Sequence, residues 1–184
     1  MVVTEKKYQL GTAENQEFLQ DVRDGLLSFG HQFPSPGGSS YYLGDDGTPW
    51  KDRNRETWIT CRMTHVYSIG SMLGHEGSEA LVDAAHEESA GNFTMTKRRW
   101  YAGLTKDGEI VPTKQCYAHA FVILAATSGI LAGREGAKEL LEDALKVYDL
   151  RFWNEEEGLS CDTWNTEFTE LDPYRGVNAK YAHR

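Results

Sequence analysis

The sequence predicts an all-α protein built from helix hairpins, in which an apolar helix alternates with an amphipathic one. Residues 57–74 and 114–133 are apolar on nearly every side, which is typical of buried helices. Residues 78–92 and 137–153 carry apolar side chains at helical spacing, with polar residues between them. Each pair leads into a loop that contains tryptophan, so one structural unit occurs twice.

This alternation predicts two layers of helices. We expect the apolar helices to form an inner layer covered on both sides, and the amphipathic helices to form an outer layer that faces water. A closed ring of such hairpins is an α/α toroid, and an open stack is a solenoid. Residues 64–69 align with residues 118–123 at a spacing of 54 residues, and a third unit would begin at Tyr174.

The part of the chain before the first unit predicts one helix and one long loop. In residues 12–30, apolar side chains recur at helical spacing. Residues 31–56 are rich in proline and glycine, which indicates an irregular segment with a short hairpin around Asp46 and Gly47. Loops of this length inside compact domains are often functional.

Glycine and serine predict the boundary between the helices of the first unit. Gly74 ends the apolar helix, and Ser78 is a suitable N-cap for the amphipathic one. Leu81, Val82 and Ala85 then form the inner face of the amphipathic helix.

The charge and hydropathy of the chain exclude several classes of partner. The formal net charge is −9 and the pI is about 5.1, so the surface repels nucleic-acid phosphates. The basic run at residues 97–99 is expected to be a solvated turn. No apolar stretch approaches the ~20 residues of a membrane span, and the N-terminus lacks the apolar core of a signal peptide.

The three cysteines, Cys61, Cys116 and Cys161, are odd in number and widely spaced. This pattern argues against a disulfide framework and indicates small buried side chains in a protein of the reducing cytoplasm. The sequence has no metal-ligating CxxC or HxxxH spacing, so we expect no metal site.

Three ordered segments and two loops carry a family resemblance. The segments are WITCRM at 58–63, KQCYAHAF at 114–121 and YRGVNA at 174–179, and the loops are RRWYAGLTKDG at 98–108 and RFWNEEEGLSCDTWN at 151–165. Together they resemble the N-acylglucosamine 2-epimerase superfamily. The resemblance is strongest to its aldose–ketose isomerase branch, the mannose isomerases and sulfoquinovose isomerases.

This resemblance implies an (α/α)6 barrel with a sugar bound in its central pocket. It implies that residues 1–184 form a single domain equivalent to about half of such a barrel, the N-terminal half. The match follows the family pattern up to Ala179 and is lost after it, so the chain is expected to be altered or truncated from that point.

The implied reaction is a cofactor-independent isomerisation, such as mannose to fructose, through a cis-enediol. The alternative within the family is 2-epimerisation of a hexose or N-acylhexosamine. Neither reaction needs a metal or a nucleotide. By the resemblance, most acid–base histidines lie in the half that this chain lacks, so we expect little activity from the chain alone.

Four residues are candidates for sugar binding through the same motifs. Arg62 would stabilise negative charge on a sugar oxygen, although a buried structural salt bridge is the alternative. Trp58 lies four residues earlier on the same helical face and would support the sugar ring, or pack in the core. Tyr117 and Asn178 would bond sugar hydroxyls, the alternatives being a core tyrosine and a helix cap.

The histidines offer no clear catalytic group. His65 and His119 fall at equivalent positions in the alignment and are interpreted as packing residues. His183 lies five residues after Asn178 instead of four, which turns it away by ~100° on a helix. The remaining three, which are expected to be solvated, are His31, His75 and His86.

Two further functions remain open from the sequence. A glycoside hydrolase needs two carboxylates across a cleft, and the acidic residues of the last loop, Asp162, Glu167 and Asp172, single out no such pair. A non-catalytic α/α binding module is the other. An incomplete ring also exposes apolar faces, so we expect self-association or pairing with a second polypeptide that carries the other half.

Overall fold

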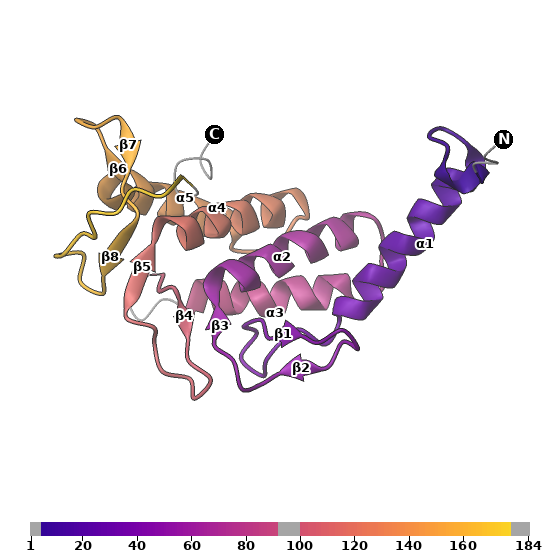
Figure 1. Ribbon diagram of the computed structural model, residues 1–184, viewed down its shortest axis with the longest axis horizontal. Helices are drawn as coiled ribbons and strands as arrows, with labels where there is room; N and C mark the ends of the chain where they lie inside the picture. Colours follow the sequence, from indigo (N-terminus) through magenta and orange to yellow (C-terminus); the bar gives the residue numbers. More distant parts are fainter. Residues whose placement is uncertain (1–4, 92–99, 178–184) are drawn as a thin grey trace.

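The computed structural model of the chain describes residues 5–91 and 100–177 (Figure 1). The described part is mainly helical, as predicted. Its α-helices are α1 (Ala13–Gly30), α2 (Thr57–Met72), α3 (Ser78–Gly91), α4 (Cys116–Leu131) and α5 (Ala137–Val147). A short 3-10 helix, η1 (Lys6–Tyr8), precedes α1, and a π-helical turn, η2 (Tyr148–Phe152), follows α5.

Helices α2, α3 and α4 lie side by side, whereas α1 extends away from them (Figure 1). Helix α2 packs against both α3 and α4, and α4 packs against α5. The prediction of fully covered inner helices is wrong in one respect. Apolar side chains of α2 and α4 remain exposed on one side, among them Ile69, Met72 and Leu131. No described helix has the length and hydropathy to cross a membrane.

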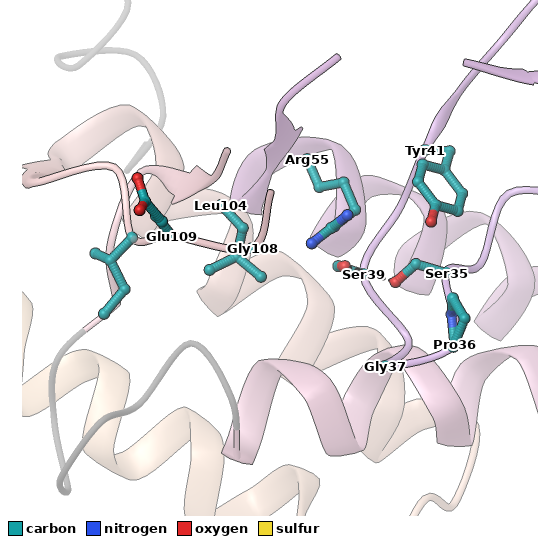
Figure 2. Close-up of a pocket in the computed structure, with 10 residues that line it drawn as sticks. Ser35, Pro36, Gly37, Ser39, Tyr41, Arg55, Leu104, Gly108 and Glu109 are labelled. Carbon is teal, nitrogen blue, oxygen red and sulfur yellow. Dashed lines mark hydrogen bonds between the residues drawn. The ribbon is translucent and has the colours of Figure 1, made fainter. Parts of the chain in front are cut away.

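Eight short strands form four antiparallel pairs among the described residues. These pairs are β1 (Tyr42–Leu43) with β2 (Pro49–Trp50), β3 (Arg55–Glu56) with β4 (Gly103–Leu104), β5 (Thr113–Gln115) with β8 (Thr163–Asn165), and β6 (Trp153–Asn154) with β7 (Leu159–Ser160). The first pair confirms the predicted hairpin around Asp46 and Gly47. The others were not predicted. Strand β3 leads directly into α2 and holds Arg55 opposite Leu104 (Figure 2).

The two units repeat at 59 residues and not at 54. Helices α2 and α4 begin at Thr57 and Cys116, 59 residues apart. Each start is held by the same bond, since Thr57 N–H donates to the Ala102 carbonyl at 2.9 Å and Cys116 N–H donates to the Asp162 carbonyl at 2.8 Å. The spacing of 54 is wrong because two helices that are apolar on most sides match in more than one register.

The turns within the two hairpins support the same register. Gly74 and Gly133 follow α2 and α4 with φ of 75° and 69°, a left-handed conformation that favours glycine. Gly77 and Gly136 precede α3 and α5 with φ of 78° and 75°. Ser78 is therefore the first residue of α3, and not its N-cap as predicted.

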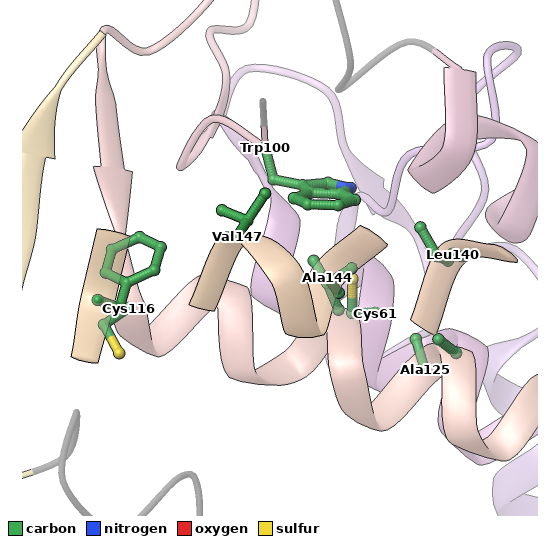
Figure 3. Close-up of a cluster of buried hydrophobic side chains, with 10 residues drawn as sticks. Cys61, Trp100, Cys116, Ala125, Leu140, Ala144 and Val147 are labelled. Atoms are coloured by element: carbon green, nitrogen blue, oxygen red, sulfur yellow. The ribbon is translucent and has the colours of Figure 1, made fainter. Parts of the chain in front are cut away.

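Small side chains allow the helices of the second unit to approach closely. Figure 3 shows the main core, in which Trp100 lies over Cys61 of α2 and side chains from α4 and α5 meet. Ala125 and Ala144 are fully buried there. A second core lies where α1, α2 and α3 meet, with Phe33 and Tyr67 stacked at 5.3 Å between ring centroids. The three free cysteines are all buried, as predicted.

The last predicted helix ends earlier than expected. The sequence predicts one helix over 137–153, whereas α5 ends at Val147 and continues as the π-helical turn η2. Phe152 at the end of this turn is buried in the main core. The predicted third unit is described only as far as Val177, so its helix lies mostly outside the described residues.

Candidate functional site

Three aromatic rings meet where α2 and α4 begin. Trp58 belongs to the first turn of α2, and Tyr117 and Phe121 belong to the first turns of α4. The Trp58 centroid lies 5.8 Å from that of Tyr117 and 6.0 Å from that of Phe121, and the Tyr117 and Phe121 centroids are 5.1 Å apart. The parallel start of two neighbouring helices therefore builds an aromatic surface from residues far apart in sequence.

Arg62 completes this group, which we call the Arg62 cluster (Trp58, Arg62, Tyr117 and Phe121). Its guanidinium carbon lies 4.8 Å from the Trp58 centroid and 4.9 Å from the Phe121 centroid. Contacts of this kind with an exposed cation contribute about 0.5–1 kcal/mol each. Arg62 is exposed, and no described carboxylate forms an ion pair with it. This excludes a buried salt bridge among the described residues.

Glu56 orients Trp58 and connects it to strand β1. One carboxylate oxygen, Oε2, accepts hydrogen bonds from the Trp58 indole N–H at 2.8 Å and from the Tyr42 hydroxyl. Burial, together with this bond to Glu56, raises the pKa of Tyr42 to about 12. The phenol therefore stays protonated at neutral pH and keeps donating to Glu56. Sequence reasoning missed both residues, because neither belongs to a recognisable motif.

A pocket of about 350 Å³ lies beside Tyr117. Its lining includes Gln115 and Asp162 from the second unit and Tyr174 and Val177 from the last described segment. Asp162 accepts a hydrogen bond from Gly176 N–H at 2.8 Å, which holds that segment against the pocket. Asn178 and His183 lie outside the described residues.

His65 and His119 are both held by hydrogen bonds at helix contacts, as their interpretation as packing residues expects. His65 Nδ1 lies 2.7 Å from the Ser128 hydroxyl of α4, and burial lowers the pKa of His65. His119 Nε2 donates to the Ala144 carbonyl of α5 at 2.8 Å. The two are not equivalent, however, because Leu124 occupies the position 59 residues after His65.

The expectation that His31 and His75 are solvated is wrong. Both are half-buried, with ring centroids 5.2 Å apart in an edge-to-face contact. His75 Nδ1 also lies 3.0 Å from the Ser78 hydroxyl. The side chain of His86 and the basic run at 97–99 lie outside the described residues.

The acidic residues of the last loop have local partners. Asp162 bonds Gly176 N–H, and Asp172 accepts from Tyr174 N–H at 2.8 Å. Among the described residues, no group of three or more His, Cys, Asp or Glu side chains could hold a metal ion. Burial raises the pKa of the Cys116 thiol to about 12, so it stays protonated at neutral pH.

Comparison with known proteins gives a consistent family. Residues 37–183 match the model of the N-acylglucosamine 2-epimerase (GlcNAc 2-epimerase) family. A D-mannose isomerase of Thermobifida fusca is 36% identical over 169 residues, which are 91% of this chain and 42% of that protein. A D-mannose isomerase of Pseudomonas cannabina pv. alisalensis is 36% identical over 124 residues, which are 67% of this chain and 30% of that protein.

Solved structures share the fold. A crystal structure of D-mannose isomerase superimposes with a TM-score of 0.81 at 20% identity, over 89% of this chain and 43% of that one. Cellobiose 2-epimerase from Bacillus thermoamylovorans B4167 gives a TM-score of 0.74 at 21% identity, over 85% of this chain and 43% of that one. The chain thus spans less than half the length of the relatives that it matches. From the match over residues 37–183, we conclude that the chain belongs to the N-acylglucosamine 2-epimerase family.

Proposed function

We propose that this chain carries a sugar-binding part of a cofactor-independent aldose–ketose isomerase that converts D-mannose to D-fructose. The main support is the Arg62 cluster, in which an exposed guanidinium lies over two aromatic rings beside Tyr117. An aromatic face suits the C–H face of a sugar ring, and a guanidinium suits its oxygens. The similarity to D-mannose isomerases suggests the substrate.

The proposed reaction moves one proton from C2 to C1 of the open-chain sugar. A base removes the C2 proton, and the electron pair moves onto the C1 carbonyl oxygen to give a cis-enediolate. Protonation at C1 and loss of the proton on the C2 hydroxyl then leave the ketone at C2. Arg62 would donate to the oxygen on which charge develops, which is where a fixed donor lowers the barrier.

The other candidate residues would position the sugar. Trp58, oriented by Glu56, would lie against the ring or the extended chain. Tyr117 would bond a hydroxyl from the pocket beside it, and Asn178 would bond another. The acid–base group is not assigned. His65 and His119 are engaged at helix contacts, and His31 and His75 contact each other near α3.

Epimerisation at C2 is the second candidate, because cellobiose 2-epimerase shares the fold. Both reactions begin with removal of the C2 proton and differ in where a proton returns. Isomerisation places it on C1 and yields fructose, whereas epimerisation returns it to the opposite face of C2 and yields glucose.

The decisive experiment measures binding and turnover separately. D-mannose would be titrated into the protein by calorimetry, and products would be followed by NMR in D2O. We expect D-mannose to bind and fructose deuterated at C1 to form slowly, since the chain spans about 42% of its mannose isomerase relative. Glucose deuterated at C2 would favour the epimerase.

A matched pair of arginine variants tests the site. Arg151 also lies over an aromatic ring at the surface, with its guanidinium carbon 5.2 Å from the Phe168 centroid. Arg62→Met should weaken D-mannose binding by about tenfold or more, which corresponds to about 1.4 kcal/mol. Arg151→Met should leave binding unchanged. If both variants bind as the wild type does, the Arg62 cluster is not the sugar site.

A further inference from the structure

The largest pocket of the described residues lies on the other side of β3 from the Arg62 cluster. Its volume is about 640 Å³, within the range of about 300–1,000 Å³ that is usual for small-molecule sites. Glu56 faces Trp58, and its neighbour Arg55 lines the pocket. Successive strand residues point to opposite faces, so β3 separates the two sites.

Arg55 presents an unused donor to this pocket. Its Nε is buried and has no hydrogen-bond partner among the described residues. A buried donor without a partner costs about 1–3 kcal/mol, and such groups in native proteins require an explanation. Figure 2 shows the side chain of Arg55 extending between Gly108 on one side and Ser39 on the other. A ligand acceptor in the pocket would satisfy it.

The two walls of the pocket are formed by hydrogen-bonded turns. In the first wall, Ser35 N–H donates to the Ser39 carbonyl at 2.7 Å, and the two hydroxyls lie 2.8 Å apart. Ser40 N–H donates to the Thr60 hydroxyl at 2.9 Å, which ties this wall to α2. In the second wall, Thr105 N–H donates to the Glu109 carbonyl at 2.7 Å. The pocket is therefore pre-formed, which lowers the entropy cost of binding.

The second unit shows why the first one is open here. Lys114 replaces Arg55 at the equivalent strand position, and Phe168 replaces Gly108 in the equivalent turn. Gly108 and Phe168 share a left-handed backbone, with φ of 88° and 59°. The Phe168 ring covers the Lys114 ammonium at 5.2 Å from its centroid, whereas Gly108 leaves Arg55 uncovered.

The lining of the pocket indicates a neutral, polyhydroxylated ligand. Arg55 supplies a cation and Glu109 an anion, so an ionic ligand of either sign meets one like charge. Tyr41 and Ser39 add hydroxyl groups, and Leu104 adds apolar surface. Alternating hydroxyls and C–H groups match such a mixture. We propose that this pocket binds a neutral mono- or disaccharide at a second site, distinct from the Arg62 cluster.

The test maps two neutral sugars and one anion onto the protein. Amide chemical shifts would be recorded by NMR during titration with D-mannose, with cellobiose and with inorganic phosphate. We expect one of the sugars to shift the amides of Gly37 and Gly108, and phosphate to leave them unchanged. Arg55→Met should weaken this binding by about tenfold or more, whereas Arg62→Met should leave it intact.

A second variant avoids dependence on Arg55 alone. An ideal Cβ at Gly108 lies 4.0 Å from Arg55 Nη2, so Gly108→Phe has room for its first atom and imitates the second unit. It should close the pocket and abolish the shifts. Shifts caused by phosphate alone, or sugar binding that survives both variants, would overturn the proposal. Sugar shifts confined to Trp58 and Tyr117 would overturn it too, while leaving the proposed function in place.

Discussion

The two helix-hairpin units share one backbone design and differ in what they do with one strand position. In the first unit Arg55 lies opposite Leu104, and in the second Lys114 lies opposite Trp164. Arg55 lines an open pocket with its guanidinium carbon 5.7 Å from the Tyr41 centroid. Lys114 is fully buried, with its ammonium 3.7 Å from the Tyr101 centroid.

This difference shows that the neighbouring segment decides the environment of a repeated position. Tyr101 belongs to the loop of the first unit, so the second unit borrows an aromatic ring from the first to cover its cation. The first unit has only the loop that contains Tyr41 on that side. A repeated backbone therefore yields a surface pocket in one unit and a structural cation in the other.

The largest expected effect comes from removing the two cations in turn. Lys114→Ala should lower the free energy of unfolding by about 2–4 kcal/mol, because it leaves a cavity under two aromatic rings. Arg55→Ala should cost less than about 1 kcal/mol, because the side chain is only half-buried in an open pocket. Denaturant unfolding of both variants measures the difference. Equal costs would contradict the distinction between the two units.

The next effect concerns the exposed side of the first unit. An apolar groove of about 360 Å³ lies between α1 and α2, and Leu26 and Ile69 line it. We expect the chain to associate through this face, with itself or with a second polypeptide. Leu26→Glu should raise the dissociation constant of self-association by about tenfold, whereas Leu10→Glu, which lies outside the groove, should not. Sedimentation at several concentrations tests this, and a wild type that stays monomeric throughout would reject self-association.

A smaller effect tests the spacing of 59 residues. Gly74→Ala and Gly133→Ala should each cost about 1–2 kcal/mol, since both positions require a left-handed backbone and neither has a neighbouring atom within reach of an added methyl. Thermal unfolding of the two variants should give similar losses. A large difference would show that the two turns are not equivalent.

The smallest effect is the pH dependence at the contact between the units. Burial lowers the pKa of His65 from its usual 6.5, so the unfolded chain takes up a proton more readily than the folded one as the pH falls. The contribution is fully present above the unfolded pKa and is lost as the pH falls through the folded one. His65→Asn should flatten the decline of stability between about pH 7 and about pH 5. An unchanged slope would mean that His65 does not titrate on unfolding.

Sequence reasoning predicted the helices more reliably than their relation to one another. The apolar and amphipathic patterns placed every long helix, because burial of a helix face depends on spacing within a short segment. The motif residues Trp58, Arg62 and Tyr117 were also selected, and the structure brings them together. The register of the repeat was missed, because apolar side chains on most faces do not define a unique alignment.

What depends on local pattern was readable from the amino acids alone: hairpin order, buried cysteines and the candidate residues that begin α2 and α4. What depends on contacts between distant segments needed the tertiary structure. The bond from Glu56 to Trp58, the cover of Tyr101 over Lys114 and the open pocket at Arg55 belong to this group. The physical reason is that strand pairs of two or three residues carry almost no sequence pattern, yet they decide which side chains face one another.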